Sequence, residues 1–267
     1  MKTLKQILLL LYVSILVSSC FKYSPYEITV SAEEANQTEK NLEKLEKLDQ
    51  SGDTVTFAFI GDSQRFYDES IDFVNAINYR HELDFVTISG DLTEFGLDDE
   101  FTGMATILNK LHVPFLTVIG NHDLIYNGRK VYEKMFGPLD YSFYFKGMKF
   151  IMINTNSREF GFDGNVPNIY WLDNQLSDTF NYKNAVVMGH IPPGNDDYDP
   201  NLVLPYANTL AKWGKTTLSM NGHNHDFSVG EPYGDGVTYL NSFSVGKGKY
   251  IIVKLWPDGF DFKIYDL

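Results

Sequence analysis

The 267-residue sequence contains a single cysteine, Cys20, and this scarcity excludes a framework of intrachain disulfides. Basic residues are also few, with 22 Lys and Arg against 35 Asp and Glu, and the formal net charge is −13 at pH 7. Proteins that bind along a nucleic-acid backbone need clustered Lys and Arg, so we expect no nucleic-acid partner. A small phosphate ester is compatible with this charge.

An almost unbroken apolar run covers residues 7–17 and follows a short basic segment. The run is too short to span a bilayer comfortably and has the flanks of a signal peptide. It ends in Val17-Ser18-Ser19-Cys20, which resembles the lipobox of bacterial lipoproteins. We therefore predict a signal peptide over residues 1–19, a lipid anchor at Cys20 and a place in the bacterial cell envelope, outside the cytoplasm. The alternatives are an ordinary secretory signal and an uncleaved anchor. No aspartate follows Cys20, which favours the outer membrane.

The rest of the sequence divides into a tether and one large domain. We predict a lipidated tether with an N-terminal helix over residues 20–52. The helix begins with the capping-box spacing of Ser31 and Glu34, continues to about residue 48, and carries a narrow leucine stripe. We expect it to lie on the surface and to be only partly docked. Residues 53–267 form the domain, and this length suits one sizeable core.

Within the domain, short apolar runs alternate with amphipathic segments. The spacing predicts helices over residues 67–80 and 98–111, with Ile71 among the inward residues of the first. Strand–helix–strand alternation implies right-handed crossovers and a largely parallel sheet, so the fold class is α/β. Later segments predict a hairpin at residues 141–154, two further helices and several short β-rich runs. This order suggests two facing sheets flanked by helices.

Five of the apolar runs end at a glycine that is followed by a potential metal ligand. The five turns are Gly61-Asp62-Ser63-Gln64, Gly90-Asp91, Gly120-Asn121-His122-Asp123, Gly189-His190 and Gly222-His223-Asn224-His225. An isolated Asp at a strand end is often only a helix cap, and an isolated His is more often structural than a ligand. Because the five turns share one pattern, we predict a metal site assembled from strand ends.

In order and spacing, these turns resemble the signature of the calcineurin-like metallophosphoesterase superfamily, which reads D-x-H, GD, GNH(D/E), H and GHxH. The resemblance extends from about residue 54 to the C-terminus. It implies a four-layer αββα sandwich of two mixed β-sheets flanked by helices. The first turn departs from the signature, because Gln64 stands where the family usually has histidine.

The resemblance also implies two divalent or trivalent transition-metal ions, with Asp91 as the bridge between them. The other implied ligands are Asp62, Gln64 and His225 for one ion, and Asn121, His190 and His223 for the other. A mixed set of oxygen and nitrogen donors suits Mn, Fe or Zn better than Ca or Mg. Glutamine oxygen is a weaker donor than imidazole to such metals, so Gln64 predicts either a weaker first site or a preference of that site for Mn.

The implied chemistry is hydrolysis of a phosphomonoester or phosphodiester by a hydroxide that bridges the two metals. His122 matches the family's histidine that is not a ligand, and would stabilise charge on the phosphoryl oxygens or protonate the leaving group. We expect Asp123 to orient His122 through its other ring nitrogen.

For substrates, we expect a small-molecule or lipid-headgroup ester at the envelope first, and a phosphoprotein second. The loop at residues 192–200 contains Asp196, Asp197 and Asp199, and we hypothesise that it discourages polyanionic substrates. The alternative function is a non-catalytic, metal-binding surface module of the same fold, weakened at Gln64.

Overall fold

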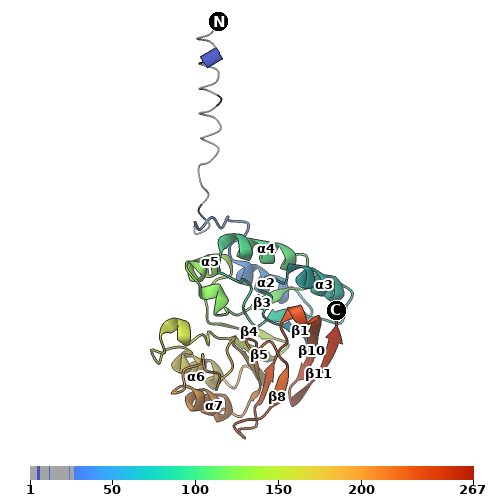
Figure 1. Cartoon of the computed structure of the whole chain (residues 1–267). Helices are drawn as coiled ribbons and strands as arrows, with labels where there is room; N and C mark the ends of the chain where they lie inside the picture. Colours follow the sequence, from blue (N-terminus) through green and yellow to red (C-terminus); the bar gives the residue numbers. More distant parts are fainter. Residues whose placement is uncertain (1–4, 7–11, 13–23, 25–26) are drawn as a thin grey trace.

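The computed structural model describes residues 5–6, 12, 24 and 27–267 (Figure 1). Cys20, most of the predicted signal peptide and part of the predicted tether lie outside these residues, so lipid attachment stays a prediction. Among the described residues, no helix is both long enough and apolar enough to cross a bilayer.

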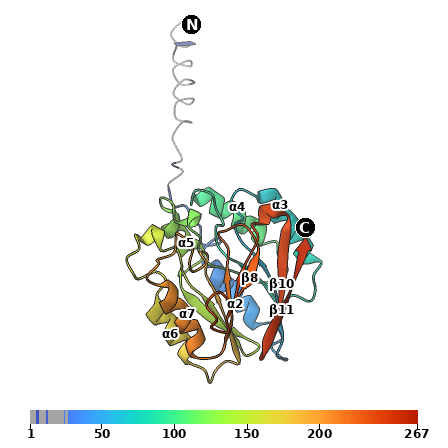
Figure 2. The same cartoon turned by 60° about the horizontal axis from the view of Figure 1, so that its bottom comes forward.

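Two mixed β-sheets form the centre of the molecule (Figures 1 and 2). The first has the order β11-β10-β1-β2-β3, in which β1, β2 and β3 run parallel and β10 pairs antiparallel with β1 and β11. The second has the order β4-β5-β6-β7-β9-β8, in which β5, β6, β7 and β9 run parallel. The strands are β1 (Val55–Ile60), β2 (Phe85–Ile88), β3 (Phe115–Thr117), β4 (Tyr141–Phe145), β5 (Met148–Met152), β6 (Asn184–Met188), β7 (Thr216–Asn221), β8 (Ser228–Gly230), β9 (Thr238–Asn241), β10 (Lys249–Trp256) and β11 (Gly259–Asp266).

Helices cover the outer face of each sheet, and the sheets pack against each other through their inner faces. Helices α3, α4 and α5 share one core with the first sheet, whereas α6 and α7 share another with the second (Figure 1). The four-layer sandwich expected from the sequence is therefore confirmed. The helices are α2 (Gln37–Glu46), α3 (Tyr67–Asn78), α4 (Asp98–Leu108), α5 (Gly128–Met135), α6 (Ile169–Ser177) and α7 (Val203–Lys212), with short 3₁₀ turns η1 (His122–Leu124), η2 (Arg158–Phe160) and η3 (Val245–Lys247).

Strand β1 shows why the potential metal ligands follow the strand ends. Ala58 and Ile60 point into the core beneath the helices, whereas Phe57 and Phe59 point into the core between the sheets. All six residues of β1 are buried. A strand that is covered on both faces is largely apolar, and Thr56 is the one polar residue of β1. The first charged side chain after β1 is Asp62, which follows Gly61.

Helix α2 begins later than the sequence indicates and is anchored by a buried asparagine. The capping-box contacts of Ser31 and Glu34 form, but they close a turn that precedes the helix, which begins at Gln37. Asn41 is completely buried, and its Oδ1 accepts a hydrogen bond from the backbone N–H of Phe115, at 3.2 Å. Strand β3 is an edge strand whose free N–H groups need partners, and α2 covers that edge. The prediction of a surface-lying, partly docked helix is confirmed, because only Gln37, Thr38, Asn41 and Leu45 of this helix are buried.

Two further details differ from the sequence-based expectation. Ile71 is 38% exposed, because the buried stripe of α3 runs through Phe73, Val74 and Ile77 instead. Helix α5 was not predicted, although Val131 and Met135 are buried on one of its faces.

Candidate metal centre

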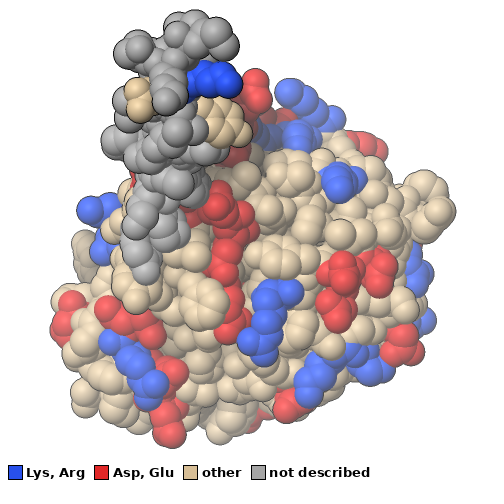
Figure 3. Space-filling view, turned by 45° about the horizontal axis from the view of Figure 1, so that its top comes forward, with Lys and Arg blue, Asp and Glu red and all other residues tan. Residues whose placement is uncertain are grey.

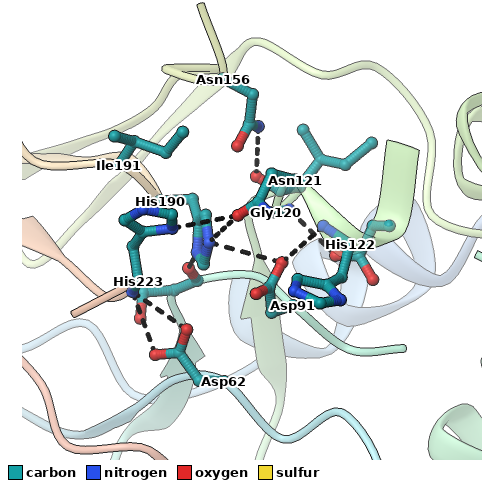
Figure 4. A network of polar contacts seen from close by, with 12 residues as sticks. Asp62, Asp91, Gly120, Asn121, His122, Asn156, His190, Ile191 and His223 are labelled. Carbon is teal, nitrogen blue, oxygen red and sulfur yellow. Dashed lines mark hydrogen bonds and ion pairs between the residues drawn. The ribbon is translucent and has the colours of Figure 1, made fainter. Parts of the chain in front are cut away.

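The turns after β1, β2 and β3 of the first sheet meet the turns after β6 and β7 of the second (Figure 4). These turns bring all seven predicted ligands into one continuous network of contacts. The seven are Asp62, Gln64, Asp91, Asn121, His190, His223 and His225. The sequence therefore predicted correctly which residues lie together, whereas metal ligation by each of them stays a prediction.

The backbone at this centre is unusual. Five of the seven predicted ligands have a positive φ, a conformation that side-chain-bearing residues adopt rarely. The values are 54° for Asp62, 37° for Gln64, 53° for Asp91, 68° for His223 and 59° for His225. Such conformations cluster at functional sites, where they aim side chains that a regular strand would point elsewhere.

Glycine at position 120 permits the close approach of two turns. A Cβ at Gly120 would lie 2.1 Å from Oδ1 of Asp91 and 2.2 Å from its backbone nitrogen. No side chain fits in that space, so glycine is required for the turn after β3 to contact the turn after β2.

Three acceptor atoms converge on His190. Its Nε2 lies 3.0 Å from Oδ1 of Asn121 and 3.4 Å from Oδ1 of Asp91. Its Nδ1 lies 2.6 Å from the backbone oxygen of Ser89, which can only accept a hydrogen bond. A neutral His190 therefore keeps its proton on Nδ1 and directs a lone pair from Nε2 towards two oxygens. Only a positive charge at that point, a proton or a metal ion, makes the arrangement favourable.

The electrostatics agree with this geometry. Burial alone would lower the pKa of His190, but the charges of Asp91 and Asp62 outweigh it and raise that pKa to about 10. One ligand atom each from Asp62, Asp91 and His190 lie within 4.8 Å of one another, and all three residues are buried. Carboxylate, amide and imidazole donors gathered in this way fit a transition-metal ion.

His223 and His225 approach the centre from the turn after β7. Nδ1 of His223 lies 3.0 Å from Oδ1 of Asn121, and its backbone N–H donates to both oxygens of Asp62. Nε2 of His225 lies 3.4 Å from Oδ1 of Asp62. The two imidazoles therefore flank Asp62 and Asn121 on the side of the second sheet.

Gln64 contacts the centre through its nitrogen. Its Nε2 donates to Oδ2 of Asp91 at 3.1 Å, and the side chain is buried. In this arrangement Gln64 orients the proposed bridging carboxylate.

His122 and Asp123 differ from the expected pairing. Nδ1 of His122 lies 2.8 Å from the backbone oxygen of Glu94, so Nε2 is the ring nitrogen that could contact a substrate. Asp123 instead accepts hydrogen bonds from the backbone N–H groups of Gly120 and Thr93 and from the hydroxyl of Thr93. The prediction that Asp123 orients His122 is wrong, because adjacent residues of the 3₁₀ turn η1 point in different directions.

Asp123 serves as a buried link between two turns. Burial and the neighbouring charge of Asp91 raise its pKa to about 7, although hydrogen bonds from Gly120 and Thr93 oppose that rise. It joins the turn after β2 to the turn after β3 and so holds Asp91 and Asn121 close together.

The acidic loop at residues 192–200 does not present all its charges to the centre. Asp199 is buried and accepts from the backbone N–H of Asn201, whereas Asp196 is exposed. Asp197 lies between Arg158 and His223, with Oδ2 3.4 Å from Nε2 of His223 and an ion pair from Oδ1 to Arg158. The sequence did not predict this contact. It also did not predict that the backbone oxygens of Ser89 and Glu94 contact His190 and His122. Nothing in the local sequence indicates that a residue contacts a site residue of another loop.

The fold and this donor set together define a metallophosphoesterase type of centre. The family profile described as calcineurin-like phosphoesterase matches residues 55–227. The glycerophosphodiester phosphodiesterase GpdQ of Enterobacter lignolyticus is 26% identical over 176 residues, which cover 59% of this chain and 62% of that protein. A probable cyclic nucleotide phosphodiesterase of Coxiella burnetii is 24% identical over 173 residues, 61% of this chain and 69% of that protein. The crystal structure of a dimetal phosphatase from Danio rerio has a TM-score of 0.67 at 14% identity, covering 80% of this chain and 97% of that one.

The chain belongs to the calcineurin-like phosphoesterase family, because the match includes all five turns, through His225. The family is metal-dependent, and Asp62, Asp91 and His190 form the candidate metal site. The likeness to the zebrafish structure shows the fold alone. The chain spans about 62% of the length of the Enterobacter relative.

Proposed function

We propose that this chain hydrolyses phosphate esters with the help of two transition-metal ions, and that phosphodiesters are its first substrate class. The observation that carries the proposal is the convergence of Asp62, Asp91 and His190 within 4.8 Å at the strand ends of a phosphoesterase fold. Both curated relatives are named as phosphodiesterases, which favours a diester over a monoester.

Seven side chains would hold the ions, with Asp91 between them. Asp62, Gln64 and His225 would bind one ion, and Asn121, His190 and His223 the other. Mn, Fe or Zn suits these donors. When bound, such ions lower the pKa of water and neutralise charge on the phosphoryl oxygens.

His122 would act on the leaving group. Nδ1 faces the backbone oxygen of Glu94 and keeps its proton there, so a protonated ring could give the proton of Nε2 to the leaving group and become neutral. The backbone N–H of His122 donates to Oδ1 of Asp91 at 3.0 Å, which fixes the position of the ring relative to the proposed bridge.

The substrate we propose is a small-molecule or lipid-headgroup ester outside the cytoplasm first, and a phosphoprotein second. The lipobox at Cys20 supports a lipid-anchored protein of the cell envelope, with the outer membrane preferred. On the face of the described residues seen in Figure 3, acidic and basic side chains are interspersed and form no continuous basic surface. Together with the formal net charge of −13, the absence of a basic track on this face supports the expectation that nucleic acid is not a substrate.

One observation favours a second candidate, a non-catalytic metal-binding module. Nε2 of Gln64 donates to Asp91, so only its amide oxygen could ligate a metal, and that oxygen is a weaker donor than the imidazole usual at this position. In this alternative only the ion held by Asn121, His190 and His223 would bind.

The test uses residues 21–267 loaded with Mn²⁺ and assayed with a chromogenic phosphomonoester and a chromogenic phosphodiester. We expect turnover of the diester, two bound ions per chain, and losses of at least about 100-fold in Asp91→Asn and His122→Ala. Asp72→Asn, an exposed site on α3, is the control for expression and folding. Turnover that survives in Asp91→Asn would contradict the proposal, and a single bound ion without turnover would favour the module.

A further inference from the structure

His223 contacts a carboxylate from a different loop through the ring nitrogen that faces away from the centre. Nδ1 of His223 lies 3.0 Å from Oδ1 of Asn121, whereas Nε2 lies 3.4 Å from Oδ2 of Asp197. If the proton of a neutral ring resides on Nε2, beside the carboxylate, Nδ1 keeps its lone pair for the centre. Asp197 therefore favours the tautomer that can bind a metal.

The same arrangement occurs at His190 with a different partner. There the nitrogen remote from Asn121 faces the backbone oxygen of Ser89, at 2.6 Å. A backbone oxygen fixes the tautomer, but a carboxylate also makes the imidazole a stronger donor, because its negative charge stabilises positive charge on the ring. His223 thus has a partner that influences both its orientation and its donor strength.

Asp197 is itself held in place by the residues around it. Its backbone N–H donates to Oδ1 of Asn195 at 2.9 Å, and its backbone oxygen accepts from the N–H of Arg158 at 3.2 Å. Its Oδ1 forms an ion pair with the guanidinium of Arg158, so Oδ2 is the oxygen left for His223. The Asp197 side chain is 15% exposed and that of Arg158 is 56% exposed.

Both His223 and Asp197 are therefore constrained before any ion binds. The backbone of His223 is fixed by its hydrogen bonds to Asp62, and the remaining freedom of the residue is rotation of its ring. The carboxylate of Asp197 limits that rotation from the outer side, and Asn121 limits it from the inner side.

We propose that Asp197 is a positioning residue, which holds the His223 ring in the orientation and tautomer that a metal ligand requires. The inference rests on the proposed metal-dependent function and adds to it a specific role for the loop at residues 192–200. The hypothesis that the acidic loop as a whole discourages polyanionic substrates stays a separate prediction. Arg158, on the short η2 turn, supports Asp197 and does not touch His223 in the described contacts.

The experiment titrates the metal-free protein with Co²⁺, following heat of binding and the visible absorption of the bound ion, neither of which needs a substrate. The variants are Asp197→Ala, Asp197→Asn and Arg158→Ala, with Asp196→Ala as the matched control, because Asp196 is an exposed neighbour in the same loop. We expect Asp197→Ala to weaken one of the binding steps about 10- to 100-fold and to change the spectrum.

The other variants separate positioning from general loop stability. Asp197→Asn keeps an oxygen acceptor, so it should recover part of the affinity, and Asp196→Ala should bind as the wild type does. Arg158→Ala should lose less than Asp197→Ala, because the contact with His223 remains. Equal losses of Co²⁺ affinity in Arg158→Ala and Asp197→Ala, with equally lowered thermal stability, would overturn the proposal. They would show that the Arg158–Asp197 ion pair only stabilises the loop.

Unchanged Co²⁺ affinity and spectrum in Asp197→Ala would also overturn it. The proposed function is tested separately, by ester hydrolysis. A wild-type protein that binds Co²⁺ tightly but hydrolyses no ester would contradict the proposed function without contradicting the role of Asp197.

Discussion

The imidazole of His190 shows how single atoms determine what this centre can bind. Its two nitrogens face only acceptors, the backbone oxygen of Ser89 on one side and oxygens of Asn121 and Asp91 on the other. A buried cluster of acceptors is unfavourable unless a positive charge lies among them. A metal ion provides that charge, and in its absence the raised pKa of His190 lets a proton do so.

Asp123 is a residue whose role is structural although it lies next to the centre. It accepts from the backbone N–H groups of Gly120 and Thr93 in a completely buried position. We expect Asp123→Ala to lower the free energy of unfolding by about 2–4 kcal/mol, because at least two buried donors lose their acceptor. Urea denaturation of the metal-free protein measures this change.

Two comparisons make that prediction specific. Asp123→Asn keeps one acceptor oxygen and should lose less than Asp123→Ala, while Asp72→Asn on the exposed side of α3 should be close to neutral. A loss below about 1 kcal/mol in Asp123→Ala would show that water replaces the carboxylate.

At the scale of elements, the close approach of the turns after β2 and β3 depends on Gly120. A Cβ there would lie 2.1 Å from Oδ1 of Asp91, so Gly120→Ala must displace the proposed bridging carboxylate. We expect Gly120→Ala to reduce Mn²⁺ affinity by at least about tenfold, because supporting geometry of this kind is worth that much to a metal site. Calorimetric titration measures the affinity.

Gly103 offers the matched control for that substitution. It lies within α4, where an added Cβ would meet only a carbon of Tyr67, at 3.7 Å. Gly103→Ala should bind Mn²⁺ as the wild type does and should be slightly more stable, since alanine favours helices. Equal Mn²⁺ affinity in both variants would contradict the argument from close approach.

Helix α2 gives a second prediction at this scale. Asn41→Ala removes the acceptor for the backbone N–H of Phe115 at the edge of β3. We expect a loss of about 1–3 kcal/mol in stability and faster hydrogen exchange at the Phe115 amide. Glu43→Ala, on the exposed side of the same helix, should change neither quantity. If exchange at Phe115 stays unchanged, α2 does not protect this edge.

The elements also show which parts of the structure can be predicted from sequence. Buried strands such as β1 are recognised because an apolar run must end where a polar turn begins, and the same rule located Asp62 and Asp91. The docking of α2 through Asn41 and the contact of Asp197 with His223 depend on partners far away in the sequence. No local pattern predicts these contacts, because the sequence around an Asn or an Asp does not show which distant residue its side chain meets. Ile71 illustrates the same limit, since helical periodicity alone does not fix the edge of a buried stripe.

At the scale of the whole molecule, the centre lies between two sheets that have separate outer cores. Asp62, Asp91 and Asn121 come from the first sheet, and His190, His223 and His225 come from the second. An ion held by residues of both sheets would therefore join the two halves of the sandwich. Ligands that bind only the folded state raise its stability by an amount that depends on their concentration relative to their dissociation constant.

This coupling predicts the response of the whole domain to metal removal. At a free Mn²⁺ concentration about 100 times the dissociation constant, one site should add about 2.7 kcal/mol to the free energy of unfolding. For a domain of this size, that corresponds to a rise of about 5–10 °C in Tm, which a chelator should reverse. Thermal unfolding with Mn²⁺ and with chelator measures the difference. Asp91→Asn should show little or none of the rise, because it weakens the carboxylate between the two sheets. A Tm that is insensitive to Mn²⁺ in the wild type would mean that the sandwich is held by its three apolar cores alone.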